Sequence, residues 1–362
     1  MSTSVVDWDV AVSTARKLVK PGPDISMEGA LSAVAELRDA AQRAESYVQE
    51  VTGLTVPSAT SPVLVVDRPG WIQANADAFA TILEPLSVRA AQRVGAGVGG
   101  RAGASIQTVS ARVSGAEVGA LLSYLAPKIL GQFDPFYAGA PGETGGRLLL
   151  VAPNVVMVER ELKLDPADFR LWVCLHEETH RVQFTSVEWL REYLNDQVEQ
   201  IVGSADLDPA AVLDMMKSAA GQLGEAFRGE REVSIVDLIQ TPAQRETVDR
   251  ITAVMSLLEG HADVVMDSVG PEVVPSVETI RSRFNNRRRA QGLDLIVRKL
   301  LGLDAKMRQY RDGARFCNRV IERVGMEGFN RVWMSPTTLP TPAEIATPDR
   351  WVERIHGLRP EG

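Results

Sequence analysis

The spacing of hydrophobic positions predicts a mostly helical chain. Residues 28–52 are rich in Ala, Glu, Gln and Arg, and apolar side chains recur there about every 3.6 residues, which is the period of an amphipathic helix. Similar patterns follow along the rest of the chain. They predict helices over residues 71–93, 111–131, 166–184, 209–227, 242–268, 275–290 and 304–324.

Two short apolar runs interrupt the helical pattern and predict strands. The run Val63–Val66 is rich in β-branched residues and lies between two prolines, and Arg147–Val151 follows a Pro- and Gly-rich turn at 141–146. A glycine-rich stretch at 95–104 lacks the Gly-Lys-Ser/Thr ending of a phosphate-binding loop, so it predicts a connector or close helix packing. Residues 335–348 hold four prolines and predict an extended segment.

Charge and composition exclude several classes of protein. The chain has 362 residues, with 47 acidic against 39 basic side chains and a net charge of −8. This balance argues against nucleic-acid binding and against docking on anionic membranes. A basic run at 281–289 is interpreted as a solvated helix face that pairs with the acidic excess. Two distant cysteines, no membrane-length apolar run and no signal-peptide pattern predict a cytoplasmic protein.

The sequence His176-Glu177-Glu178-Thr179-His180 is an HExxH motif in a chain with only four histidines. Asp165 and Pro166 mark the start of the helix that carries it. On a helix, His176 and His180 project from one face and can bind the same zinc ion. Glu177 is rotated by about 100° and can take a proton from a water that the metal activates. The alternative is a pair of histidines without metal, but burying them unpaired would be costly.

A third metal ligand is expected on the helix predicted over 242–268. Glu259, which lies 79 residues beyond His180, is the preferred ligand, and Asp263 one turn later would accept a hydrogen bond from a ligand histidine. Gly260 would let two helices approach closely. His261 is the rival third ligand. It lies about 200° around the helix from Glu259, so the two are not expected to bind one metal together. A solvated acidic helix face without metal is the remaining interpretation.

These motifs resemble those of zincin metallopeptidases of the glutamate-ligand type. In that group HExxH supplies two histidines and the general base, and a downstream Glu-x-x-x-Asp supplies the third ligand and a supporting aspartate, as Glu259 and Asp263 would here. The chain also resembles a largely actinobacterial family of zincin-like type 2 metallopeptidases, also described as hydrolases associated with deazaflavin-coenzyme biosynthesis. That resemblance covers most of the chain, including 131–134 and 175–184.

The resemblance implies a predominantly helical α+β fold with a zincin-like core, a small β-sheet and one zinc ion per chain. It implies hydrolysis of a peptide or small amide substrate, with Glu177 as base. The strand at 148–151 would be the sheet edge that pairs with an extended peptide. The alternatives are a helical scaffold with a structural or vestigial zinc site, and an amidohydrolase of a small metabolite.

The predicted organisation has three parts. A mostly helical region at 1–140 precedes a zincin-like metal-binding region at 141–334, and an extended tail at 335–362 ends the chain. The three parts are also compatible with one integrated domain.

Overall fold

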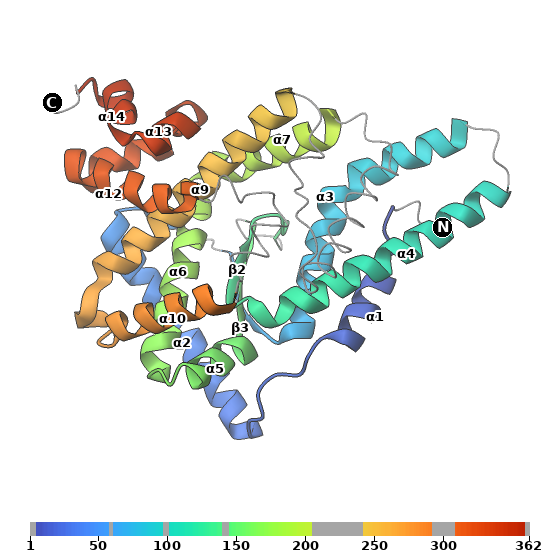
Figure 1. The fold of residues 1–362 in the computed structure, drawn as a ribbon, viewed down its shortest axis with the longest axis horizontal. Coiled ribbons are helices and arrows are strands. Elements are labelled where there is room, and N and C mark those ends of the chain that lie inside the picture. The colour runs from blue at the N-terminus through green and yellow to red at the C-terminus, as the bar shows by residue number, and fades with distance from the viewer. Residues whose placement is uncertain are drawn as a thin grey trace.

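A computed structural model describes residues 5–57, 61–96, 101–139, 145–204, 242–291 and 308–358. Helices dominate these residues, and three short strands form one sheet, so the predicted α+β, mainly helical class is confirmed (Figure 1). The strands are β1 (Val63–Val66), β2 (Gly131–Asp134) and β3 (Arg147–Val151). The longer helices are α1 (Trp8–Leu18), α2 (Met27–Thr52), α3 (Arg68–Ala96), α4 (Arg101–Leu125), α5 (Ala152–Glu161), α6 (Pro166–Ser186), α7 (Glu188–Ser204), α9 (Pro242–Val273), α10 (Val277–Gln291) and α12 (Arg308–Phe329).

The sheet has the strand order β1-β3-β2, with β3 parallel to β1 and antiparallel to β2. The central strand β3 is therefore paired along both of its edges. This order contradicts the prediction that residues 148–151 offer a free edge to a substrate. The strand that lies at the sheet edge beside α6 is β2.

Helices cover both faces of the sheet (Figure 1). Side chains alternate along β3, so Leu150 joins a core formed mainly by α2, α5 and α6, whereas Leu149 and Val151 join a second core formed with α1, α3 and α4. This alternation explains why the four residues of β3 that follow Arg147 are all apolar. The sheet thereby has α2 and α6 against one face and α1, α3 and α4 against the other.

Several element boundaries differ from the sequence prediction. The helix expected over 111–131 ends at Leu125, because Pro127 follows and a single 3-10 turn leads into β2. Helices α1, α5 and α7 were not predicted. The helix expected over 209–227 lies outside the described residues, and the predicted glycine-rich connector lies partly outside them.

The prediction of an extended segment at residues 335–348 is wrong. Its prolines begin short helices, α13 (Pro342–Ala346) and α14 (Pro348–His356), since a proline at the first helical position needs no N–H partner. Thr341 caps α13 in a reciprocal arrangement with Glu344. The fully buried Trp351 packs into a third core with side chains of α7, α9 and α12, so the tail is part of the folded body.

The basic run forms the expected pairs where the structure describes it. Arg281 forms an ion pair with Asp267, and Arg287 forms one with Glu161 at 3.0 Å. The boundaries at 140 and 334 stay a prediction, although α2 and α6 share one core across the first of them. Among the described residues, no helix combines the length and apolar character needed to cross a bilayer.

Candidate metal centre

Helix α6 carries the HExxH motif and begins where the sequence predicted. The Asp165 carboxylate accepts a hydrogen bond from the Asp168 backbone N–H at 3.0 Å, and Pro166 occupies the first turn. The residues between this cap and the motif are buried, from Phe169 to Leu175. The helix is therefore fixed by local capping and by its apolar faces before any metal is considered.

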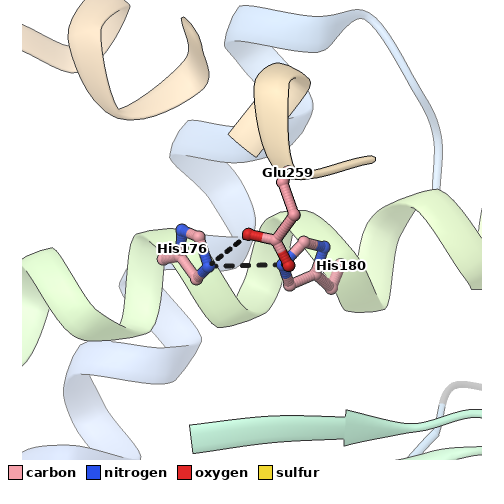
Figure 2. A group of neighbouring side chains, drawn as sticks. All are labelled: His176, His180 and Glu259. Atoms are coloured by element: carbon pink, nitrogen blue, oxygen red, sulfur yellow. Dashed lines mark hydrogen bonds and ion pairs between the residues drawn. The ribbon is translucent and has the colours of Figure 1, made fainter. Parts of the chain in front are cut away.

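His176, His180 and Glu259 converge between α6 and α9 (Figure 2). The two Nε2 atoms lie 3.3 Å apart, and the Glu259 carboxylate oxygens lie 3.6 Å from Nε2 of His176 and 3.7 Å from Nε2 of His180. Ligands bonded to a tetrahedral zinc at ~2.0–2.1 Å lie about 3.3 Å from one another. The observed spacing therefore suits three protein ligands around one cation.

The hydrogen bonds behind the histidines test whether this group fits a metal. Nδ1 of His180 lies 3.0 Å from Oε1 of Gln183, which can only accept, so this nitrogen carries the proton and Nε2 presents a lone pair. Nδ1 of His176 lies 3.3 Å from the Met266 sulfur, also an acceptor. Two imidazole lone pairs and a carboxylate thus face one point, an arrangement that a divalent cation satisfies.

Glu177 lies beside this group but is not part of it. Its side chain is buried against β2, where Gly131 is packed so closely that any side chain there would collide with the Glu177 carboxyl group. Burial, and after it the negative charges of Glu259 and Glu178, together raise the pKa of Glu177 to about 8. The Glu177 carboxyl group is therefore held between the group of His176, His180 and Glu259 and the edge strand.

Close helix packing places Glu259. Gly260 lies against the backbone of Gly313 and Ala314 in α12, and Gly313 lies against Ser256 of α9, so neither glycine leaves room for a β-carbon. The predicted role of Gly260 in close helix approach is confirmed. This contact supports the turn of α9 that directs Glu259 toward α6.

The whole chain can be compared with known proteins. A family model described as zincin-like metallopeptidase matches residues 6–352. The chain belongs to the zincin-like metallopeptidase family. It is also similar to a crystal structure from Chloroflexus aurantiacus, described as a "putative hydrolase with a novel fold", at 29% sequence identity and a TM-score of 0.67 over 99% of this chain and 100% of that one. No curated protein matches the chain at a significant level.

The rival ligand of this zincin-like metallopeptidase is not part of the group of His176, His180 and Glu259. His261 is fully buried, its ring stacks on Phe329 with centroids 5.2 Å apart, and its Nδ1 lies 2.9 Å from Nε2 of Gln183. Burial and the nearby His180 lower the pKa of His261 to about 3. The group found among the described residues that could hold a metal ion has three side chains, and His261 is not one of them.

Asp263, the other predicted participant, has an exposed side chain on α9. The atom next to Nδ1 of His180 belongs to Gln183, and the sulfur of Met266 lies next to Nδ1 of His176. The support expected from Asp263 stays a prediction, while the structure provides Gln183 behind His180. The sequence did hold a signal for this residue, because Gln183 follows His176 and His180 at helical spacings of seven and three.

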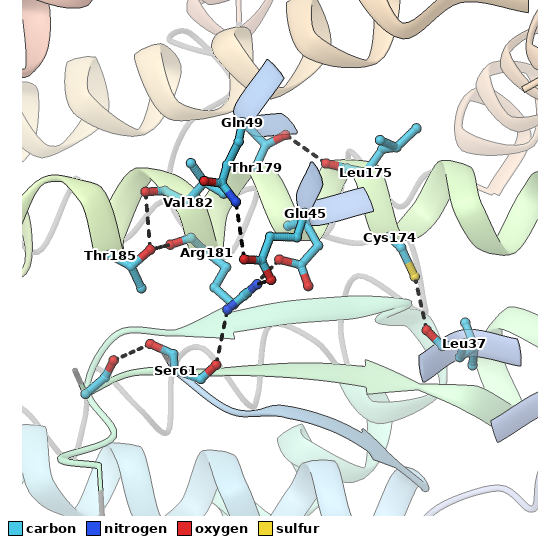
Figure 3. A network of polar contacts seen from close by, with 12 residues as sticks. Leu37, Glu45, Gln49, Ser61, Cys174, Leu175, Thr179, Arg181, Val182 and Thr185 are labelled. Atoms are coloured by element: carbon cyan, nitrogen blue, oxygen red, sulfur yellow. Dashed lines mark hydrogen bonds and ion pairs between the residues drawn. The ribbon is translucent and has the colours of Figure 1, made fainter. Parts of the chain in front are cut away.

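A buried charge network holds α6 against α2 on the side away from the metal (Figure 3). Arg181 donates to Glu178 at 2.6 Å, pairs with Glu45 of α2, and reaches the Ser61 carbonyl at 3.4 Å. On the same side, the Cys174 thiol donates to the Leu37 carbonyl, which agrees with a buried structural cysteine rather than a ligand. The network anchors the motif helix to the N-terminal part of the chain.

We expect Arg181→Met to destabilise the protein strongly. It would leave Glu178 fully buried without its cation, which costs about 3 kcal/mol in the free energy of unfolding. Urea unfolding followed by circular dichroism measures this change. Arg43→Met removes an exposed pair with Asp39 on α2 and should change the stability by less than about 1 kcal/mol. Equal losses in the two variants would contradict the assigned role.

Proposed function

We propose that this zincin-like metallopeptidase is a zinc-dependent hydrolase that cleaves peptide bonds. The observation that carries the proposal is the convergence of three acceptor groups, from His176, His180 and Glu259, beside the buried carboxyl group of Glu177. Such a set needs a cation to be stable, and a base next to it is what a hydrolytic reaction needs.

Zinc is the metal that this donor set favours. Two imidazoles and one carboxylate are a common protein ligand set for catalytic zinc, whereas a structural zinc site is usually closed by a fourth protein ligand. The group found among the described residues has three, so a coordination position would be left for water or substrate. When bound, zinc supplies a Lewis acid that makes water acidic and polarises a carbonyl group.

Glu177 is the proposed proton carrier. Its carboxylate accepts a proton from the attacking water and later donates that proton to the leaving amine. A carboxyl group performs both transfers best when its pKa lies near the working pH, and burial moves the pKa of Glu177 in that direction. The contact with Gly131 fixes the carboxyl group between the ligands and the edge strand.

The substrate is proposed to bind as an extra strand along β2. The Leu130 carbonyl accepts a hydrogen bond from the Val151 N–H of β3 at 2.8 Å. By the alternation of an antiparallel ladder, Gly131 and Phe133 direct their backbone N–H and C=O groups away from β3, toward the outer edge. An extended peptide paired with this edge would pass beside Glu177, which favours a peptide over a small metabolite.

The proposal is tested first by metal content. We expect about one zinc per chain by mass spectrometry in protein purified without a histidine tag or added metal. Removal of the zinc by a chelator should abolish cleavage of a mixed peptide library, and added zinc should restore it. Protein that holds no zinc and takes none up would overturn the proposal. Zinc-loaded protein that cleaves small amides but no peptide would overturn the substrate class.

A further inference from the structure

The side chain of Gln183 connects the two helices that carry the proposed metal ligands. It extends from α6 into the contact with α9 and is fully buried. Its amide nitrogen donates to the Leu258 carbonyl at 3.1 Å and lies 2.9 Å from Nδ1 of His261, and its oxygen lies 3.0 Å from Nδ1 of His180. Both N–H groups and one lone pair of the amide are therefore used.

The proton positions along this series of hydrogen bonds follow from the Leu258 carbonyl. The Leu258 carbonyl can only accept, so the nitrogen of the Gln183 amide must face it and the oxygen must face His180. His180 then carries its proton on Nδ1. The second amide N–H points at Nδ1 of His261, which must accept, so the neutral ring of His261 carries its proton on Nε2. The two histidines are thus required to be opposite tautomers.

Aromatic packing holds His261 in place at the end of this series of hydrogen bonds. The His261 ring packs against Phe329, with centroids 5.2 Å apart, and against Trp333, with centroids 5.5 Å apart. Because the ring is fully buried and packed against both aromatic side chains, it cannot turn toward the metal group without losing these contacts. His261 therefore serves as a fixed acceptor for Gln183.

We propose that Gln183, held by His261 and by the Leu258 carbonyl, is a positioning residue that fixes the tautomer and orientation of His180 for metal binding. Leu258 and His261 flank Glu259 on the same turn of α9. One amide thus sets the lone pair of one ligand and binds the backbone next to another. The effect on zinc rests on the proposed function, whereas the tautomers are a property of the metal-free protein.

The first test uses the unaltered, metal-free protein. With only four histidines in the chain, long-range ¹H–¹⁵N NMR on mildly alkaline samples separates the ring nitrogens of each one. We expect Nδ1–H for His180 and Nε2–H for His261. The opposite assignment for either ring would overturn the proposal, and this result does not depend on whether the protein binds zinc.

The second test uses Gln183→Met, which keeps the length of the side chain and removes all three polar contacts. We expect zinc affinity to fall by about 10- to 100-fold, and His180 to populate the Nε2–H tautomer in the metal-free variant. Gln197→Met is the matched control, because Gln197 is buried on α7 and accepts from Arg250 of α9 away from the metal group. It should bind zinc as the unaltered protein does.

The outcomes separate the two proposals. Unchanged zinc affinity and unchanged tautomers in Gln183→Met would overturn the positioning role while leaving the metallohydrolase intact. An unaltered protein that binds no zinc would overturn the metallohydrolase and the zinc half of the positioning role. If Gln183→Met does not fold, as judged by circular dichroism, the tautomers of the unaltered protein still decide the question.

Discussion

Glu177→Gln should lower the rate of hydrolysis by about 10²- to 10⁴-fold while leaving zinc bound, because an amide keeps the shape of the side chain but cannot accept the proton of the attacking water. The three proposed ligands are left untouched by this change. The measurement is kcat on a cleaved peptide, together with zinc content per chain in the same preparation.

The matched control for this variant is Glu188→Gln, an exposed glutamate in the first turn of α7. It should retain both zinc and activity. Full activity in Glu177→Gln would show that Glu177 takes no part in the reaction. One that loses its zinc would instead show that the carboxylate is needed for the integrity of the metal centre.

Local sequence signals were sufficient to predict the motif helix. The cap at Asp165, the proline at the first turn and the apolar run before His176 all act within a few residues of one another, and α6 begins and ends close to the predicted limits. The shared face of His176 and His180 follows from helix geometry alone. These features could be predicted because they do not depend on which elements pack together.

The edge strand could not be predicted in this way. Order along the chain suggested β3, because only α5 separates it from the motif helix. Strand order in a sheet, however, is decided by tertiary packing. The edge strand beside α6, β2, has only four residues and begins at the last residue of the helix predicted over 111–131, and no element was predicted for its other three residues. A pattern of so few residues does not distinguish a strand from the end of a helix.

The hydrogen bonds that hold the proposed metal ligands could not be predicted from the sequence either. The spacing of Gln183 from His176 and His180 indicates only that it shares their helix face. Its hydrogen bonds appear only when α9 brings Leu258 and His261 against it. The angular separation of Glu259 and His261 on one helix predicted that they would not bind one metal together, and the structure groups Glu259, without His261, with the two HExxH histidines. Angles within a helix were predictable, whereas contacts between helices were not.

The assignment of the third ligand leads to the second large effect. Glu259→Ala should reduce zinc binding from about one ion per chain to far below that amount, since two imidazoles alone leave the cation without a charged ligand in a partly buried site. Hydrolysis should be lost with the metal. Isothermal titration of the metal-free variant with zinc, followed by a peptide-cleavage assay, measures both losses.

Glu272→Ala is the matched control, because it removes an exposed glutamate from the same helix, beyond the kink at Gly270. It should bind zinc and cleave peptides as the unaltered protein does. If Glu259→Ala still bound zinc at full affinity, the third ligand would have to be another side chain. In that case His261→Phe, which preserves the aromatic stack on Phe329, would be compared with Gln183→Met. Loss of zinc in His261→Phe together with retained zinc in Gln183→Met would identify His261 as that ligand.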